Sequence, residues 1–165
     1  FLFGGNMLKI NIICVGKIKE QYLKDAINEY SKRLSKYCNL NILELQDKKI
    51  PEKSNVTIEN QIKETESNDI LLHLPKDSFN ICLDLKGKEY SSIEFAKLLN
   101  EISLINSTVT FIIGGSLGFN NTVINSCKES VCFSKMTFPH QLIRVFLLEQ
   151  IYRAFKINNN ETYHK

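Results

Sequence analysis

The fold is indicated by one stretch of the chain, Thr108-Val-Thr-Phe-Ile-Ile-Gly-Gly-Ser-Leu-Gly118. Its first six residues are β-branched, aromatic or aliphatic, which is typical of a buried strand. Glycines follow at the strand end, where a parallel sheet binds its ligands, and glycine lets the backbone approach a ligand closely. The GGxxG spacing matches neither a dinucleotide-binding GxGxxG nor a Walker loop. Alone, it fits a ligand-binding loop and a tight strand-to-helix turn equally well.

Strands and helices alternate along the rest of the chain. Hydrophobic patterning predicts further strands at 8–15, 40–45, 79–85 and 131–137, and helices at 20–37, 57–74, 91–105, 121–128 and 140–157. The third of these helices opens on a capping box, Ser91-Ser-Ile-Glu94. Gln46–Asn55 is a polar connector. This alternation predicts a single α/β domain with a mainly parallel sheet and helices on both faces.

The composition is that of an ordinary globular protein, with 24% charged and 43% hydrophobic residues. No apolar run approaches the roughly 18–20 residues that cross a bilayer. Residues 1–6 precede Met7 and have no features of an export signal, so we interpret them as a cloning remnant and place the domain at 7–165. We therefore expect a cytoplasmic protein that makes no membrane contact.

The five cysteines are odd in number and scattered, and no CxxC occurs. This pattern favours reduced thiols over disulfides and predicts no metal site.

Net charge is concentrated at the end of the chain. The segment 135–165 carries +3, which equals the net charge of the whole protein. Such a basic end could contact phosphates. A chance fluctuation of a few charges remains the simpler explanation of the charge alone.

Two features surround the last helix. Phe133–His140 leaves a strand end, so its backbone groups are free to bind the edge of an adenine, although a purely structural loop fits as well. Pro139 suits the first helical turn. The helix itself is apolar on nearly every face, which predicts that the sheet and a second subunit cover it.

The arginines of this helix differ in their neighbours. Arg144 has no acidic residue three or four positions away, so we expect its guanidinium to be free for a phosphate, a base or another chain. Arg153 follows Glu149 by four residues, which predicts a helix ion pair. No Ser-His-Asp, Cys-His or paired-carboxylate pattern supports hydrolytic chemistry.

Several motifs in order resemble the ribosomal large-subunit RNA methyltransferase H family, over Met7 to Lys165. These motifs are Ile13-Cys-Val-Gly-Lys17, Leu83-Asp-Leu-Lys-Gly-Lys88, Phe111 to Gly118, Phe133 to Arg144, Glu149-Gln-Ile-Tyr-Arg-Ala-Phe155 and Tyr163-His-Lys165. Ser116 and Leu117 fill the middle of the glycine loop, where relatives vary.

The resemblance implies a SPOUT fold with a C-terminal trefoil knot, a homodimer, and S-adenosylmethionine bound in the knot loops. It further implies methylation of N3 of a pseudouridine in large-subunit rRNA, on the assembled ribosome. A sulfonium is already an activated electrophile, so the protein has mainly to position donor and acceptor. Carried over by motif, the donor-binding residues are Leu83, Gly114, Phe133, Ser134, Lys135, Met136, Thr137 and Phe138.

We expect Arg144, Tyr163 and His164 to act on the RNA side of the site, with the C-terminal tail contributed either by the same chain or across the dimer. Two rival interpretations remain at this point. One is a non-catalytic ribosome-binding module that retains the fold. The other is a nucleotide-binding protein of the flavodoxin or dehydrogenase type, against which the missing GxGxxG argues.

Overall fold

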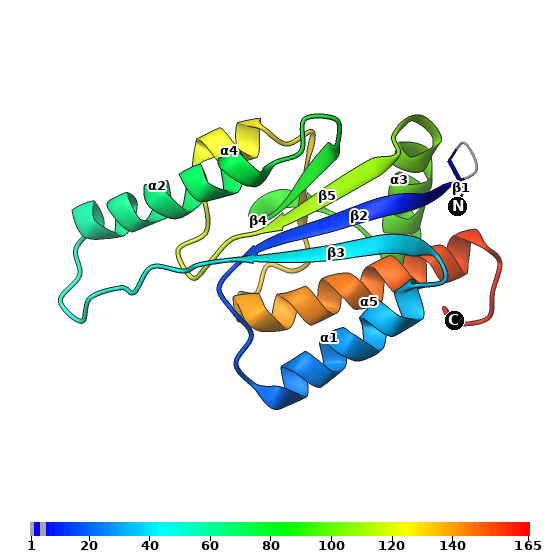
Figure 1. The fold of residues 1–165 in the computed structure, drawn as a ribbon, viewed down its shortest axis with the longest axis horizontal. Coiled ribbons are helices and arrows are strands. Elements are labelled where there is room, and N and C mark those ends of the chain that lie inside the picture. Colours follow the sequence, from blue (N-terminus) through cyan, green and yellow to red (C-terminus); the bar gives the residue numbers. More distant parts are fainter. Residues whose placement is uncertain (1, 4–5) are drawn as a thin grey trace.

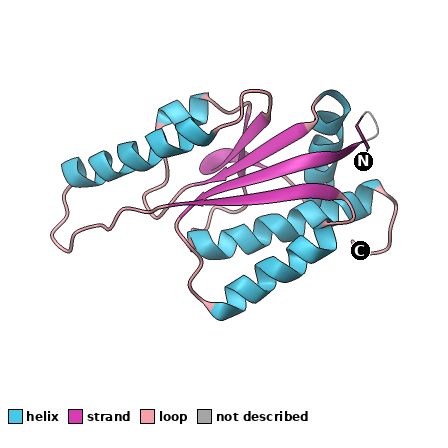
Figure 2. Ribbon diagram, in the orientation of Figure 1, coloured by secondary structure: helices cyan, strands magenta, loops and turns pink. Residues whose placement is uncertain are grey.

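A twisted parallel sheet forms the centre of the molecule (Figures 1 and 2). The computed structural model describes residues 2–3 and 6–165. Five parallel strands stand in the order β3-β2-β5-β4-β6, and the short β1 pairs with the start of β2 in antiparallel orientation. Their bounds are β1 Leu2–Phe3, β2 Asn6–Val15, β3 Cys38–Leu45, β4 Phe79–Glu89, β5 Thr108–Ile113 and β6 Glu129–Cys132. The predicted α/β class with a mainly parallel sheet is confirmed.

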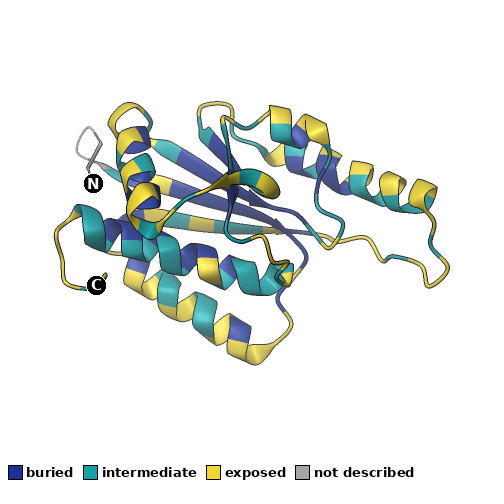
Figure 3. Cartoon of the chain, turned by 180° about the vertical axis from the view of Figure 1, so that it is seen from behind, coloured by how far each residue is buried: buried dark blue, intermediate teal, exposed yellow. Residues whose placement is uncertain are grey.

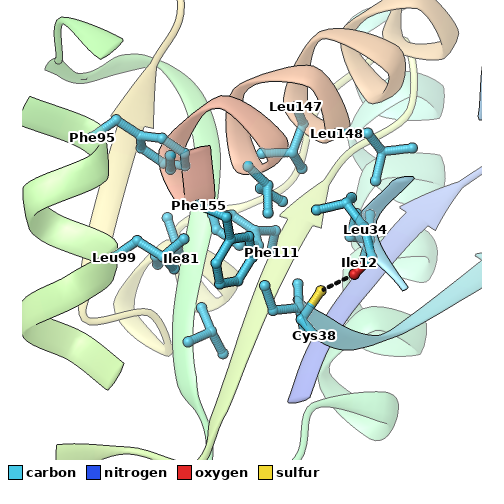
Figure 4. Packing of buried hydrophobic residues seen from close by; sticks show 14 of the residues in the cluster. Ile12, Leu34, Cys38, Ile81, Phe95, Leu99, Phe111, Leu147, Leu148 and Phe155 are labelled. Carbon is cyan, nitrogen blue, oxygen red and sulfur yellow. Dashed lines mark hydrogen bonds between the residues drawn. The ribbon is translucent and has the colours of Figure 1, made fainter. Parts of the chain in front are cut away.

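The helices cover the two faces of the sheet and match the predicted segments closely. They are α1 Gln21–Leu34, α2 Val56–His73, α3 Ser92–Ile105, α4 Asn121–Asn125 and α5 His140–Asn158. Successive residues of a strand point to opposite faces. Ile12 of β2 accordingly lies in the core under α1, α3 and α5, whereas Ile13 lies in the smaller core under α2 and α4. Figure 4 shows the packing of the larger core. Figure 3 shows the molecule from behind, coloured by how far each residue is buried.

Helix α5 is largely covered by its own chain. It packs against α1 and α3 as well as against the sheet, and Phe146, at 37%, is its one exposed large hydrophobic residue. Sequence periodicity does not show which helices flank α5, and α1 and α3 supply part of the cover that was expected from a second subunit. The dimer itself stays a prediction.

Two strand boundaries differ from the sequence prediction. β4 continues to Glu89, after a register shift that pairs both Leu83 and Lys88 with Val131. A Cβ at Gly87 would lie 2.7 Å from the backbone of Ser130, so only glycine permits this close passage. β6 ends at Cys132 instead of continuing to 137, and the Ser134 hydroxyl then accepts a turn bond from the Met136 backbone N–H at 3.0 Å.

The capping box is confirmed. The Ser91 hydroxyl accepts a bond from the Glu94 N–H at 3.1 Å, and the Glu94 carboxylate accepts one from the Ser91 N–H at 2.7 Å. Within the described residues, no helix has the length and apolarity to span a bilayer. The first six residues stay a predicted remnant: 2–3 form β1, while 1, 4 and 5 lie outside the described residues.

Candidate functional site

A cavity of about 740 Å³ lies at the edge of the sheet where the parallel strands end. Its walls come from residues 83–86 of β4 and from the chain at and just after the ends of β5 and β6, together with parts of α2, α4 and α5. The short β1 and the C-terminus lie at the opposite end of the strands (Figure 1). This is the edge at which open α/β sheets bind ligands.

The predicted donor-binding residues converge on this cavity although they come from three separate segments. Seven of them line it: Leu83, Gly114, Phe133, Ser134, Met136, Thr137 and Phe138. Lys135 is exposed and is not among the lining residues. The cavity wall also includes Lys63, Asp84 and Lys86, which local sequence patterns did not single out.

Gly114 of the glycine loop packs against the chain itself, whereas the sequence analysis considered only the approach of a ligand. A Cβ at Gly114 would lie 2.9 Å from the carbonyl carbon of Gly118 and 2.9 Å from the Phe119 ring. Gly118 has a positive φ of 73° and donates its N–H to the Gly115 carbonyl at 3.0 Å. Gly114 is therefore required by close approach of the chain to itself, and replacing it would displace the loop.

Two side chains of helix α2 form hydrogen bonds with segments that lie beside the cavity. The carboxylate of Glu66, only 5% exposed, accepts a bond from the Lys48 N–H at 2.9 Å and so fixes the start of the 46–55 connector. The fully buried Ser67 accepts a bond from the Asn120 N–H at 3.0 Å, just after the glycine loop. Burial raises the pKa of Glu66 above its usual value, and the Lys48 backbone bond opposes this effect.

Arg144 is not free, which corrects the sequence expectation. Its side chain is 1% exposed, and it donates to the Glu44 carboxylate at 2.7 Å and to the Gly16 carbonyl at 3.0 Å. Its Nε is buried with no hydrogen-bond partner among the described residues. The helix-neighbour argument missed Glu44 because the pair spans 100 residues of sequence. The arginine joins α5 to the ends of β2 and β3.

His140 begins α5 and lines the cavity one helical turn before Arg144. Its ring also borders a smaller hollow that includes Asp47, Lys48 and part of the glycine loop. Burial lowers the pKa of His140, the positive charge of Arg144 lowers it further, and Asp47 opposes both effects. The neutral imidazole is therefore the favoured form in this position.

The C-terminal tail folds back on the far half of α5. The predicted Arg153–Glu149 pair is confirmed at 2.6 Å. Tyr163 donates to Glu149 at 3.2 Å, and His164 contacts Arg153 at 3.1 Å. Burial and the nearby Glu149 raise the pKa of Tyr163, so its hydroxyl stays protonated.

The structure thus separates the three residues expected on the RNA side. None of the three lines the cavity: Arg144 is buried one helical turn after His140, which does line it, and Tyr163 and His164 lie in the tail. Glu149 lies nine residues beyond His140, which is about 13 Å along the axis of α5. In one chain the tail consequently does not reach the cavity.

Comparisons with known proteins are consistent across nearly the whole chain. A family model described as "Predicted SPOUT methyltransferase" matches residues 8–164. The chain is 54% identical over 159 residues to the ribosomal RNA large subunit methyltransferase H of Clostridium acetobutylicum, and 57% identical to that of Clostridium botulinum strain Hall. Each alignment covers 96% of this chain and the whole relative.

A solved structure titled as a probable methylase family protein from Haemophilus influenzae has a similar fold. Its TM-score is 0.54 at 13% identity, and the match covers 96% of this chain and 72% of that one. At this identity the likeness concerns the fold alone.

Proposed function

The chain belongs to the SPOUT methyltransferase family, and from this premise we propose that it methylates large-subunit ribosomal RNA with S-adenosylmethionine as donor. The cavity at the carboxyl edge of the sheet carries the proposal. Its volume of about 740 Å³ falls within the roughly 300–1,000 Å³ of typical small-molecule sites. Bound there, the donor would supply an activated methyl group.

The residues of the cavity suit this donor chemically. The chain leaves the sheet after Cys132, so backbone groups of 133–138 are outside the strand ladder. Apart from the Met136 N–H and the Ser134 carbonyl, which bond within the turn, they are available to an adenine edge. Apolar side chains such as Leu83 and Ile143 offer surface for packing. Asp84, also in the wall, offers a carboxylate for ribose hydroxyls or for the cationic end of the donor.

The acceptor is proposed from the family resemblance and from the names of the relatives. We propose N3 of a pseudouridine, which needs only orientation and removal of one proton. A single small domain has little surface with which to select one site on naked RNA, so the substrate is the assembled ribosome in the cytoplasm. The family's C-terminal trefoil knot belongs to the same proposal.

The arrangement of the tail supports a homodimer. Tyr163 and His164 lie at the far end of α5 from the cavity of their own chain. We propose that they reach the cavity of a second copy and orient the RNA base there. Arg144 would then act as a positioning residue, because its guanidinium holds the Gly16 turn beside His140 and is already paired with Glu44.

Replacing Thr137 with Trp should weaken S-adenosylhomocysteine binding at least ~10-fold, or about 1.4 kcal/mol. Thr137 is exposed and lines the cavity, so an indole fits there without removing core contacts but fills space needed by the donor. Isothermal titration calorimetry measures the affinity. Lys135→Trp is the matched control: it lies two residues away, is exposed, and does not line the cavity.

Equal loss in both variants would show that the 133–138 loop responds to any bulky residue, and the cavity assignment would be wrong. If the wild-type protein binds no S-adenosylhomocysteine but still binds ribosomes, the non-catalytic module is the correct interpretation.

A further inference from the structure

Four segments in or near the wall of the cavity and of its neighbouring hollow share one electrostatic feature. Each of the segments 16–20, 46–55, 84–88 and 133–139 contains one more lysine than acidic residues. Together they carry +4, which exceeds the +3 of the whole chain. We call their lysines the lysine rim: Lys17, Lys19, Lys48, Lys49, Lys53, Lys86, Lys88 and Lys135.

The rim lysines form no ion pairs with the described residues, whereas three of the five cations of segment 135–165 do. All eight rim lysines are exposed. None forms a salt bridge with a residue that the structure describes. By contrast, Arg144, Arg153 and Lys156 are each paired with a glutamate of the same chain. The +3 of segment 135–165 already counts Glu149 and Glu161. Glu44 offsets Arg144, so, among the described residues, the charge left unpaired in that segment is that of Lys135, which belongs to the rim, and of Lys165.

The connector 46–55 is the most exposed part of the rim. It projects beyond the end of the sheet (Figure 1) and carries Lys48, Lys49 and Lys53. Its first residues border the small hollow that shares Gly115, Ser116, Leu117 and His140 with the donor cavity. The Glu66–Lys48 backbone bond keeps this end of the connector beside the glycine loop.

We propose that the lysine rim binds the RNA phosphates on either side of the nucleotide presented to the cavity, with the connector as the main contact. This rests on the proposed function for the identity of RNA as the partner. Unpaired lysines on flexible stems suit phosphates, which they bind as point charges with little demand on geometry. The binding they provide is independent of sequence, so the rim fixes position and leaves base selection to the cavity.

The test compares two triple variants. Lys48→Ala/Lys49→Ala/Lys53→Ala removes the connector lysines, and Lys32→Ala/Lys36→Ala/Lys76→Ala removes three exposed lysines near the opposite edge of the sheet. Affinity for large ribosomal subunits is measured over a series of KCl concentrations, alongside KM and kcat for methylation and calorimetric affinity for S-adenosylhomocysteine.

In the connector variant, the slope of log affinity against log salt concentration should become shallower by about two to three. Each lost phosphate contact reduces the magnitude of this slope by close to one. KM for ribosomes should rise at least ~10-fold, while kcat and donor affinity stay within about twofold. The control variant should behave as wild type.

An unchanged salt slope, or an equal loss in the control variant, would overturn the proposal. Its failure is distinct from failure of the proposed function. If the wild-type protein transfers no methyl group to ribosomes, the function is wrong, yet the binding slopes of the two variants still decide the role of the rim.

Discussion

A chain that ends at Glu161 should bind S-adenosylhomocysteine like the full-length protein but methylate ribosomes at least ~10²-fold more slowly, the scale of losing a positioned catalytic group. The cut removes Tyr163 and His164 and leaves Glu161 in place. Glu161 accepts bonds from Lys156 at 2.8 Å and from Tyr37 at about 3 Å. The contacts of Glu161 with the end of α5 are therefore kept, while those of Tyr163 with Glu149 and Tyr152 and of His164 with Arg153 are lost. These lost contacts lie at the chain end, so the fold should be retained.

Thermal unfolding and calorimetry serve as the structural readouts for this variant. Tyr163→Phe and His164→Ala then divide the effect between the two side chains. Methylation at the full rate by the truncated chain would remove the tail from the mechanism. Loss of donor binding together with activity would instead assign the tail to the donor side.

Subunit mixing tests whether the tail acts across a dimer. The partner for the truncated chain is a full-length Gly114→Val chain, whose added side chain would collide with Gly118 and displace the loop beside the donor cavity. Each homodimer lacks one component of the site. Random pairing makes half of the dimers mixed, and each mixed dimer has one complete site, so activity should recover to about a quarter of wild type. No recovery on mixing would mean that each tail serves its own chain.

Local features of the structure could be predicted from the sequence. The Ser91 capping box depends on residues three apart, and the apolar run at 8–15 predicts a buried strand, which β2 is, with side chains in the cores on both faces of the sheet. The end of β6 could not be placed, because 133–137 continues the apolar pattern of a strand. What ends the strand there is a turn made by the Ser134 hydroxyl.

The contacts that decide the candidate site are long-range, and no local pattern reveals them. Glu44 pairs with Arg144 across 100 residues, and Ser67 bonds to Asn120 across 53. Gly114 illustrates a subtler case. The sequence located the loop, but whether the glycine makes room for a ligand or for Gly118 depends on how the loop closes.

Replacing Glu44 and replacing Arg144 should lower the free energy of unfolding by unequal amounts. Arg144 is 1% exposed, whereas the Glu44 side chain is 35% exposed. Glu44→Leu leaves a buried guanidinium without its counter-charge, and we expect it to lower the free energy of unfolding by about 4 kcal/mol. Arg144→Met leaves a carboxylate that water can still reach, and we expect about half that loss. Urea unfolding at neutral pH measures both.

The double variant completes the cycle and separates the structural role of Arg144 from a chemical one. Because Glu44→Leu is harmful mainly through the stranded arginine, Glu44→Leu/Arg144→Met should be more stable than Glu44→Leu alone. If Arg144 acts only by holding the Gly16 turn, methylation in Arg144→Met should fall along with stability, and Arg144→Lys should recover part of both. An Arg144→Met protein that unfolds like wild type and binds donor normally, yet methylates ribosomes ~10²-fold more slowly, would contradict this. The guanidinium would then contact the RNA directly, as the sequence alone had suggested.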